Sequence, residues 1–389
     1  MPFYQKRGMI PPKRHTVFKK PDGTLYREQV MGTRGFSGIQ SIVYHLNAPT
    51  EIEHVGKIRD LTPKYAESIP LQHRHFATFS LEHQGESNDP VMGRIYLLGN
   101  EDVRIAVCRP AVGMDYFYRN AEGDEILFVH EGKGYLETIF GKLSYEEGDY
   151  LVIPVGTTYR VVMESEATRF LVIESSGPIT TPRRYRNEHG QLLEHSPYCE
   201  RDIRTPEELV THDEKGKFEV RVKLHNQLHS YEYGFHPLDT VGWDGYLYPW
   251  AFNIKNFEPI TGRIHLPPPV HQTFEGEGFV ICSFVPRLFD YHPEAIPAPY
   301  YHSNVDSDEV LYYVDGQFMS RKGISEGSMT LHPMGLPHGP HPGTIEASIG
   351  KKDTYEYAVM IDTFKPLRIT KQALSCEDEN YVYSWLPKS

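Results

Sequence analysis

The sequence predicts an all-β protein that contains two related barrels. Short segments rich in β-branched and aromatic residues recur along the chain, and Gly, Pro, Asp or Asn bounds each of them. Many neighbouring segments lie about 8–12 residues apart, as expected of a sandwich or barrel. The chain contains 30 Pro and 32 Gly among 389 residues, and no long helical pattern alternates with the strands as it would in an α/β fold.

Eight segments are expected to form strands, and one short segment a helix. The strands are expected at residues 103–110, 125–132, 133–141, 149–156, 168–177, 278–285, 309–316 and 355–364. A helix is expected over 205–210, because Thr205 can cap it and Pro206 suits its first position. Residues 181–234 are polar, which indicates connecting and peripheral structure.

Two stretches repeat the same order of features. Each contains Asp-Glu, an apolar strand, Gly, Glu-Gly, a further strand and a Pro-x-Gly turn; one begins near Glu125 and the other near Glu309. The interval of about 184 residues indicates two copies of one barrel unit rather than a short-period solenoid. We therefore expect an N-terminal β domain over 1–250, with a barrel at about 116–180 and a connecting segment, and a C-terminal catalytic domain over 251–389.

Composition and charge exclude several classes of partner. The formal net charge of −12 disfavours nucleic acid and anionic membranes, both of which require basic patches. The four cysteines are far apart and form no CxxC motif, which fits a reducing cytoplasm. The N-terminus lacks the apolar run of a signal peptide, and no segment is apolar enough to span a membrane, so neither export nor membrane insertion is expected.

The repeated pattern resembles the cupin superfamily of double-sheet jelly-roll (double-stranded β-helix) barrels. In that superfamily a His and a Glu near one strand, and a His after the Pro-x-Gly turn, hold a metal. The second copy has all three residues, as His302, Glu309 and His338. Two imidazoles and one carboxylate suit non-haem Fe(II), because they leave positions open for substrate and dioxygen.

Asp308 is the rival carboxylate to Glu309. Adjacent side chains on a strand point to opposite faces, so only one of the two can face the metal, and alignment with Glu125 favours Glu309. The first copy keeps Glu125 but has Arg119 or Asn120 near the first His position and Tyr159 at the second. We therefore expect a bicupin whose N-terminal barrel lacks metal ligands, with one metal ion per chain.

Other histidines are candidates for proton transfer or support. His332 precedes His338 by six residues and is expected either to relay a proton or to hydrogen-bond a ligand. His265 and His271 flank a triple proline that would hold an imidazole in place, so each is a candidate general base or a structural residue. His341 is a weaker candidate ligand than His338. His73 and His75 would share a strand face, but no third ligand is near them in sequence, so a second metal is not expected there.

A closer resemblance is to the homogentisate 1,2-dioxygenase family, particularly its bacterial branch. It is carried by Tyr300-Tyr301-His302-x-Asn304, then Glu309, then residues 331–340, with 279–287 upstream. It implies Fe(II) at His302, Glu309 and His338, with His332 in the pocket. It also implies ring cleavage of homogentisate with dioxygen to give maleylacetoacetate in tyrosine and phenylalanine catabolism, in a cytoplasmic trimer or hexamer.

The chain departs from that family in two places. Compared with the eukaryotic members it has one extra residue within 303–308, and it has no His in the segment 256–259 that matches the family's general base. His265 and His271 remain as candidates for that role. The substrate carboxylate would be attracted by the iron and by Arg263, Arg287 or Arg321, among which the sequence does not choose.

Three other functions fit parts of the pattern. A cupin dioxygenase for gentisate or hydroquinone would use the same three ligands. A zinc or manganese bicupin isomerase is a second alternative, since the ligand set is not exclusive to iron. A metal-free storage or binding bicupin is disfavoured, because the ligand set is complete.

Overall fold

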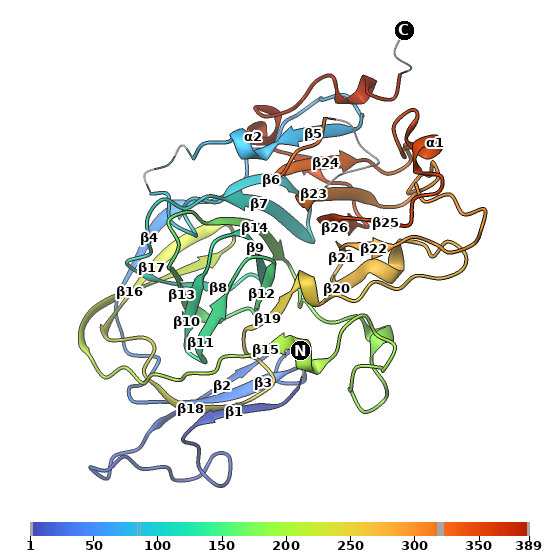
Figure 1. Ribbon diagram of the computed structural model, residues 1–389. Coiled ribbons are helices and arrows are strands. Elements are labelled where there is room, and N and C mark those ends of the chain that lie inside the picture. The colour runs from blue at the N-terminus through green and yellow to red at the C-terminus, as the bar shows by residue number, and fades with distance from the viewer. Residues whose placement is uncertain (1–2, 84, 86, 317–322, 387–389) are drawn as a thin grey trace.

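The computed structural model describes residues 3–83, 85, 87–316 and 323–386. Almost all regular structure in these residues is β, which confirms the predicted all-β fold with two barrels (Figure 1). Each of the eight expected segments contains a strand. The helices are single turns: α1 (Thr344–Ser348), α2 (Lys371–Leu374) and the 3₁₀ turns Thr78–Ser80, Arg183–Tyr185, Glu200–Asp202, Ile254–Asn256, Pro268–His271 and Tyr381–Tyr383. None of these described helices has the length and apolarity needed to cross a bilayer.

The N-terminal barrel is built from two large sheets. One has eight strands in the order β15 (Ile203–Arg204), β19 (Trp250–Asn253), β12 (Asp149–Ile153), β9 (Glu125–Glu131), β14 (Arg169–Ser175), β7 (Val103–Cys108), β6 (Ile95–Gly99) and β27 (Arg368–Ile369). The other has seven in the order β11 (Gly141–Tyr145), β10 (Gly134–Thr138), β13 (Thr158–Met163), β8 (Phe117–Asn120), β16 (Lys215–Leu224), β17 (Gln227–Phe235) and β4 (Ile52–Asp60).

The C-terminal barrel centres on a six-stranded sheet. Its order is β20 (Gln272–Gly276), β21 (Phe279–Phe284), β26 (Glu356–Thr363), β23 (Asp308–Gly316), β24 (Ser328–His332) and β5 (Arg74–Ala77). The same half of the chain contains a two-stranded ribbon, β22 (Arg287–Leu288) with β25 (Asp353–Thr354). A separate four-stranded sheet near the N-terminus contains β1 (Gln5–Gly8), β18 (Thr240–Gly245), β3 (Gln40–His45) and β2 (Arg27–Gly32).

Strands from outside each barrel complete its sheet. β5 comes from before the first barrel but pairs with β24 of the second, and β27 comes from after β26 but pairs with β6 of the first. The two barrels are therefore tied together by backbone hydrogen bonds as well as by side-chain packing.

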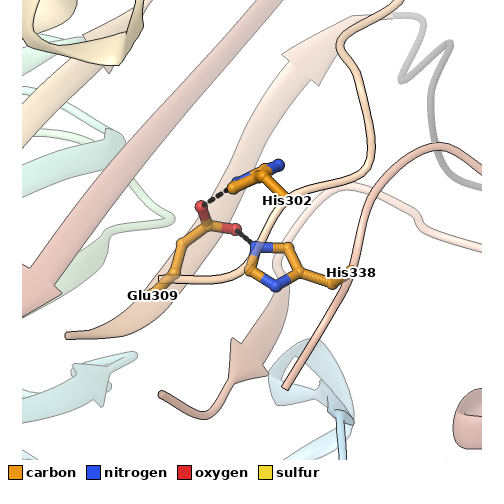
Figure 2. Close-up of side chains that lie close together, drawn as sticks. All are labelled: His302, Glu309 and His338. Atoms are coloured by element: carbon orange, nitrogen blue, oxygen red, sulfur yellow. Dashed lines mark ion pairs between the residues drawn. The ribbon is translucent and has the colours of Figure 1, made fainter. Parts of the chain in front are cut away.

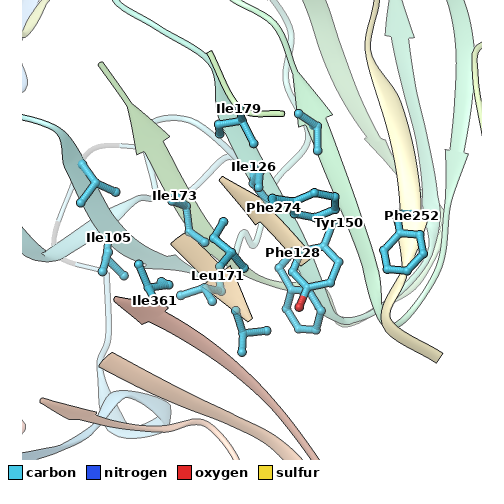
Figure 3. Packing of buried hydrophobic residues seen from close by; sticks show 14 of the residues in the cluster. Ile105, Ile126, Phe128, Tyr150, Leu171, Ile173, Ile179, Phe252, Phe274 and Ile361 are labelled. Carbon is cyan, nitrogen blue, oxygen red and sulfur yellow. The ribbon is translucent and has the colours of Figure 1, made fainter. Parts of the chain in front are cut away.

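Alternation along the central strands separates two apolar cores. Leu127 and Val129 of β9 face the interior of the N-terminal barrel, whereas Ile126 and Phe128 face outward. The outward residues pack with Ile361 of β26 and Phe274 of β20 in the core that joins the barrels (Figure 3). Burial of these side chains, each worth about 1.5–3 kcal/mol, fixes the register of both sheets.

Two expectations from the sequence are wrong. Residues 205–210 form no helix, because their backbone pairs with β11: the Lys142 N–H donates to Glu208 O at 2.7 Å and the Glu207 N–H to Lys142 O at 3.1 Å. Residues 181–234 are more than connecting structure, because they contain β16 and most of β17, which are central in the seven-stranded sheet.

Candidate metal centre

Backbone pairing brings His302 and His338 side by side. The His302 N–H donates to His338 O at 2.9 Å, and the His338 N–H donates to His302 O at 2.8 Å. Residues that exchange two hydrogen bonds in this way present their side chains on the same face. Two loops distant in sequence therefore place two imidazoles together.

Strand alternation selects the carboxylate that joins them. Glu309 lies on β23 beside the two imidazoles, with its Oε2 3.9 Å from His302 Nε2 and its Oε1 3.5 Å from His338 Nε2 (Figure 2). The Asp308 carboxylate instead accepts hydrogen bonds from the backbone N–H groups of Met334 at 2.8 Å and Leu367 at 2.7 Å. Asp308 thus fixes two loops, and Glu309 faces the site.

The donor atoms of this trio suit a metal ion. One donor atom each from His302, Glu309 and His338 lies within 4.8 Å of the others, and no other such cluster of three occurs in the part of the chain that the structure describes. The Nδ1 atoms of His302 and His338 each lie 3.2 Å from a backbone carbonyl two residues earlier. Since a carbonyl can only accept, each Nδ1 carries the proton and each Nε2 lone pair faces the site. His338 Nε2 is buried without a hydrogen-bond partner, as expected of a ligand atom.

His332 supports the carboxylate from the neighbouring strand. It lies directly opposite Glu309 in the β23–β24 register, and its Nδ1 donates to Glu309 Oε1 at 2.7 Å. Its Nε2 then accepts from the Tyr381 hydroxyl at 3.1 Å. Burial raises the pKa of Glu309, but the surrounding imidazoles of His302, His332 and His338 outweigh it and hold that pKa well below its usual range. The carboxylate is therefore ionised, as a metal ligand must be.

The C-terminal turn Tyr381–Tyr383 and the residues after it cover this cluster. The Trp385 indole N–H donates to Gly339 O at 3.0 Å, next to His338. His341 lies against the Trp385 ring, with 4.7 Å between ring centroids, and its Nε2 is 3.0 Å from Ser384 Oγ. His73 packs with its ring centroid 5.8 Å from that of His338. His341 and His73 therefore pack around the centre.

His265 borders a cavity beside the cluster. The cavity has a volume of about 480 Å³, and its lining includes His265, Arg263, Tyr300 and Tyr301. The Tyr300 ring lies 5.1 Å from the His265 ring and 6.1 Å from the His302 ring, so it adjoins both the cavity histidine and His302. His265 Nδ1 is 3.4 Å from Asp290 Oδ2.

His271 lies in a different environment. Its ring is buried against Phe284, with 4.7 Å between centroids, and burial together with Arg287 and His265 lowers its pKa to about 3. The structure therefore does not bring His271 to the cluster.

Two arginines were candidates for binding a substrate carboxylate besides Arg263. Arg287 is paired with Glu356 at 3.0 Å. Arg321 lies outside the described residues.

Two further groups near the centre were not predicted from the sequence. Tyr381 is separated from His332 by 49 residues, so no local spacing could reveal the contact. Asp362 lies opposite Glu309 in the β23–β26 register, and its Oδ1 is buried without a hydrogen-bond partner. Burial and the charge of Glu309 raise the pKa of Asp362 to about 8.

The corresponding place in the N-terminal barrel has a different set of partners. Glu125 accepts a hydrogen bond from the Tyr159 hydroxyl at 2.5 Å and pairs with Arg94 at 2.7 Å. Arg94 also pairs with Glu174 at 2.8 Å, and Glu174 contacts Lys223. A guanidinium thus stands beside the glutamate that corresponds to Glu309.

Comparisons with known proteins show the family to which the chain belongs. The homogentisate 1,2-dioxygenase N-terminal model matches residues 94–254, and the C-terminal model of the same family matches 269–388. The chain is 44% identical over 388 residues to "Putative dioxygenase SSO1533" of Saccharolobus solfataricus, with 99% of each chain aligned.

More distant relatives and a solved structure also align with the chain. The chain is 28% identical to homogentisate 1,2-dioxygenases of Bradyrhizobium diazoefficiens and Sinorhizobium fredii; 70% of this chain aligns with 63% and 62% of theirs, so it spans less than two thirds of their length. An oxalate decarboxylase structure from Bacillus subtilis aligns over 82% of this chain and 85% of that one, at 12% identity and a TM-score of 0.35. On the family models and the full-length relative, the chain belongs to the homogentisate 1,2-dioxygenase family and is a dioxygenase.

Proposed function

We propose that the protein is an Fe(II)-dependent dioxygenase that cleaves the ring of homogentisate, with His302, Glu309 and His338 as the iron ligands and one iron per chain. The observation that carries the proposal is the convergence of two Nε2 lone pairs and one ionised carboxylate within 4.8 Å. When bound, the iron would supply open coordination positions for the substrate oxygens and dioxygen, and the electrons that activate dioxygen.

His332 acts as a positioning residue in this proposal. Its Nδ1 N–H donates a hydrogen bond to Glu309, and its Nε2 lone pair accepts a hydrogen bond from the Tyr381 hydroxyl. Both ring nitrogens are therefore engaged, and the ring holds the carboxylate in one orientation instead of accepting a substrate proton.

His265 is the better of the two candidate general bases. It borders the cavity of about 480 Å³ that reaches Tyr300, next to the ligand His302. The Asp290 carboxylate near Nδ1 favours the tautomer with its proton on Nδ1, which leaves Nε2 able to accept a phenolic proton. His271 is buried against Phe284 and borders no part of this cavity.

Arg263 is the best candidate to attract the substrate carboxylate. It lines the same cavity as His265, whereas Arg287 is already paired with Glu356. A guanidinium in the cavity offsets the net charge of −12, which by itself would repel an anionic aromatic substrate.

The reaction is tested by oxygen uptake. Protein loaded anaerobically with Fe(II) is given homogentisate, gentisate and hydroquinone in turn, and product absorbance is followed in parallel. Uptake with homogentisate alone is expected. Uptake with another ring instead would retain the metal site but change the substrate. No uptake with any ring would contradict the proposal and direct attention to a zinc or manganese isomerase.

His265→Gln and His271→Gln form a matched pair for the general base. His265→Gln is expected to slow turnover about 100- to 10,000-fold while iron content is unchanged, because proton transfer is lost. His271→Gln should alter stability more than turnover. Equal turnover in wild type and His265→Gln would remove His265 from the mechanism.

Assembly and location belong to the same proposal. We expect a cytoplasmic homo-oligomer, a trimer or a hexamer. Apolar side chains along the edge strand β4, those of Ile52, Val55 and Ile58, are exposed in the single chain and offer a surface for such contacts. Light scattering after size-exclusion chromatography would give the number of subunits, and a monomer would contradict the expectation.

A further inference from the structure

The two barrels place acidic residues at equivalent positions of two neighbouring strands. In the N-terminal barrel Glu125 of β9 lies opposite Ile153 of β12 and Glu174 of β14. In the C-terminal barrel Glu309 of β23 lies opposite His332 of β24 and Asp362 of β26. Glu174 and Asp362 therefore correspond, each lying directly across the strand pair from the glutamate of its barrel.

Strand alternation shows where the Asp362 side chain lies. Its neighbour Ile361 points into the core between the barrels (Figure 3), and Val310, the neighbour of Glu309, belongs to the same core. Asp362 and Glu309 therefore share the opposite face, inside the C-terminal barrel. Directly opposite residues on one face have Cβ atoms about 4.5–5.5 Å apart, so the two carboxylates face the same small volume.

In the N-terminal barrel the two carboxylates share permanent cations. Arg94 contacts Glu125 and Glu174 at 2.7 and 2.8 Å, and Lys223 also contacts Glu174. All four side chains are almost completely buried, with exposures of 0–4%. Such burial is tolerated only because each charge has a partner.

In the C-terminal barrel the corresponding pair has no such cation. Within the described ranges, no Lys or Arg forms an ion pair with Glu309 or Asp362; the ion-pair partners of Glu309 are the imidazoles of His302, His332 and His338. Asp362 Oδ1 is buried and accepts no hydrogen bond. Two carboxyl groups thus face each other, and no Lys or Arg of the described residues pairs with either of them.

We propose that Asp362 is a further residue of the metal centre and supplies its second negative charge. This inference rests on the proposed function, because it requires a cation held by His302, Glu309 and His338. A divalent ion at that place would be attracted by both carboxylates, and their combined charge would balance the ion. The metal ion would balance the charge of the two carboxylates in the C-terminal barrel, as Arg94 does for Glu125 and Glu174 in the N-terminal barrel.

The test measures metal affinity and thermal stability in Asp362→Asn, which removes the charge and keeps the shape. Co(II) serves as the probe, with its affinity measured by competition titration and its visible absorption recorded. We expect Asp362→Asn to bind Co(II) about 10- to 100-fold more weakly than wild type, with an altered spectrum. The metal-free variant should unfold at the same temperature as the metal-free wild type or higher, because Asp362 Oδ1 accepts no hydrogen bond that the substitution would remove.

Two controls make the same chemical change elsewhere. Asp315→Asn changes an exposed residue of β23, the strand of Glu309, where Asp315 accepts a hydrogen bond from the Tyr355 hydroxyl, and should leave both measurements unchanged. Glu174→Gln should lower the unfolding temperature of the metal-free protein, because Arg94 and Lys223 lose a partner, and should leave Co(II) affinity unchanged.

Each outcome has a distinct meaning. Asp362→Asn affinity within twofold of wild type would overturn the inference, as would a fall in the unfolding temperature of its metal-free form, which would mark Asp362 as structural. Wild type that binds Co(II) but consumes no oxygen would contradict the proposed function and leave the inference in place. Wild type that binds no Co(II) would overturn both.

Discussion

The two barrels differ in the cation beside their central glutamate. In the N-terminal barrel Arg94 is covalently part of the chain and pairs with both Glu125 and Glu174. In the C-terminal barrel the imidazole lone pairs and Glu309 surround a place that a metal ion fits. The same strand positions thus hold a permanent ion network in one barrel and, as we propose, an exchangeable cation in the other, and only the second would offer open positions to a substrate.

The pKa values of the corresponding acids express this difference. Burial raises the pKa of Glu174, but Lys223 and Arg94 outweigh it and bring that pKa down to about 2. Burial and the charge of Glu309 raise the pKa of Asp362 to about 8, and no Lys or Arg in the described part of the chain forms an ion pair with it. The sign of the shift is set by the partner, since both side chains are largely removed from water.

The largest expected effect separates two adjacent carboxylates. Glu309→Gln should abolish metal binding and turnover, because the only carboxylate of the ligand trio is lost. Asp308→Asn should retain the metal but destabilise the protein by about 1–3 kcal/mol, since one of two backbone N–H groups loses its acceptor. Metal content by mass spectrometry, with thermal unfolding, measures both. Loss of metal in Asp308→Asn but not in Glu309→Gln would reverse the assignment.

The next effect tests the permanent cation. Arg94→Met should destabilise the protein by about 3–5 kcal/mol, because two buried carboxylates lose a partner, while metal content stays the same. Arg160→Met, which removes a partly exposed pair with Glu137, should cost less than about 1 kcal/mol. Denaturant unfolding of the two variants gives the difference. Equal stabilities would show that Glu125 and Glu174 do not depend on Arg94.

The smallest effect concerns the residue behind the metal centre. Tyr381→Phe removes the hydroxyl that donates to His332 and should weaken metal binding about tenfold, because His332 then holds Glu309 less firmly. Tyr383→Phe makes the same change on an exposed ring of the same turn and should bind metal like wild type. Indistinguishable affinities in the two variants would leave Tyr381 with a packing role alone.

Local sequence pattern predicted the features that depend on strand alternation and turns. It distinguished Glu309 from Asp308, and the structure places the two carboxylates in different surroundings. The helix expected at 205–210 failed because Thr205 and Pro206 are compatible with a helix start, whereas pairing with the distant β11 decided the structure.

Features that depend on distant contacts were beyond local pattern. Arg94 lies 31 residues before Glu125 and 80 before Glu174, and nothing near it in sequence indicates either pair. Asp362 did leave a signal, because Ile361-Asp362-Thr363 matches Ile173-Glu174-Ser175 when the internal repeat is extended by one more strand. The repeat showed where a second acid would lie, but only the register between strands shows that it faces Glu309.

The exchange of strands and the C-terminal turn bear on biosynthesis. The sheet that carries Glu309 needs β5, which is made early, and the contacts around His332 need Tyr381 and Trp385, which are made after all the described strands. A nascent chain on the ribosome can therefore form the N-terminal sheets as far as β19, all but their last strand β27, long before the site for the metal is enclosed. We expect metal loading to follow release of the full chain, so that no partly synthesised protein holds a reactive ion.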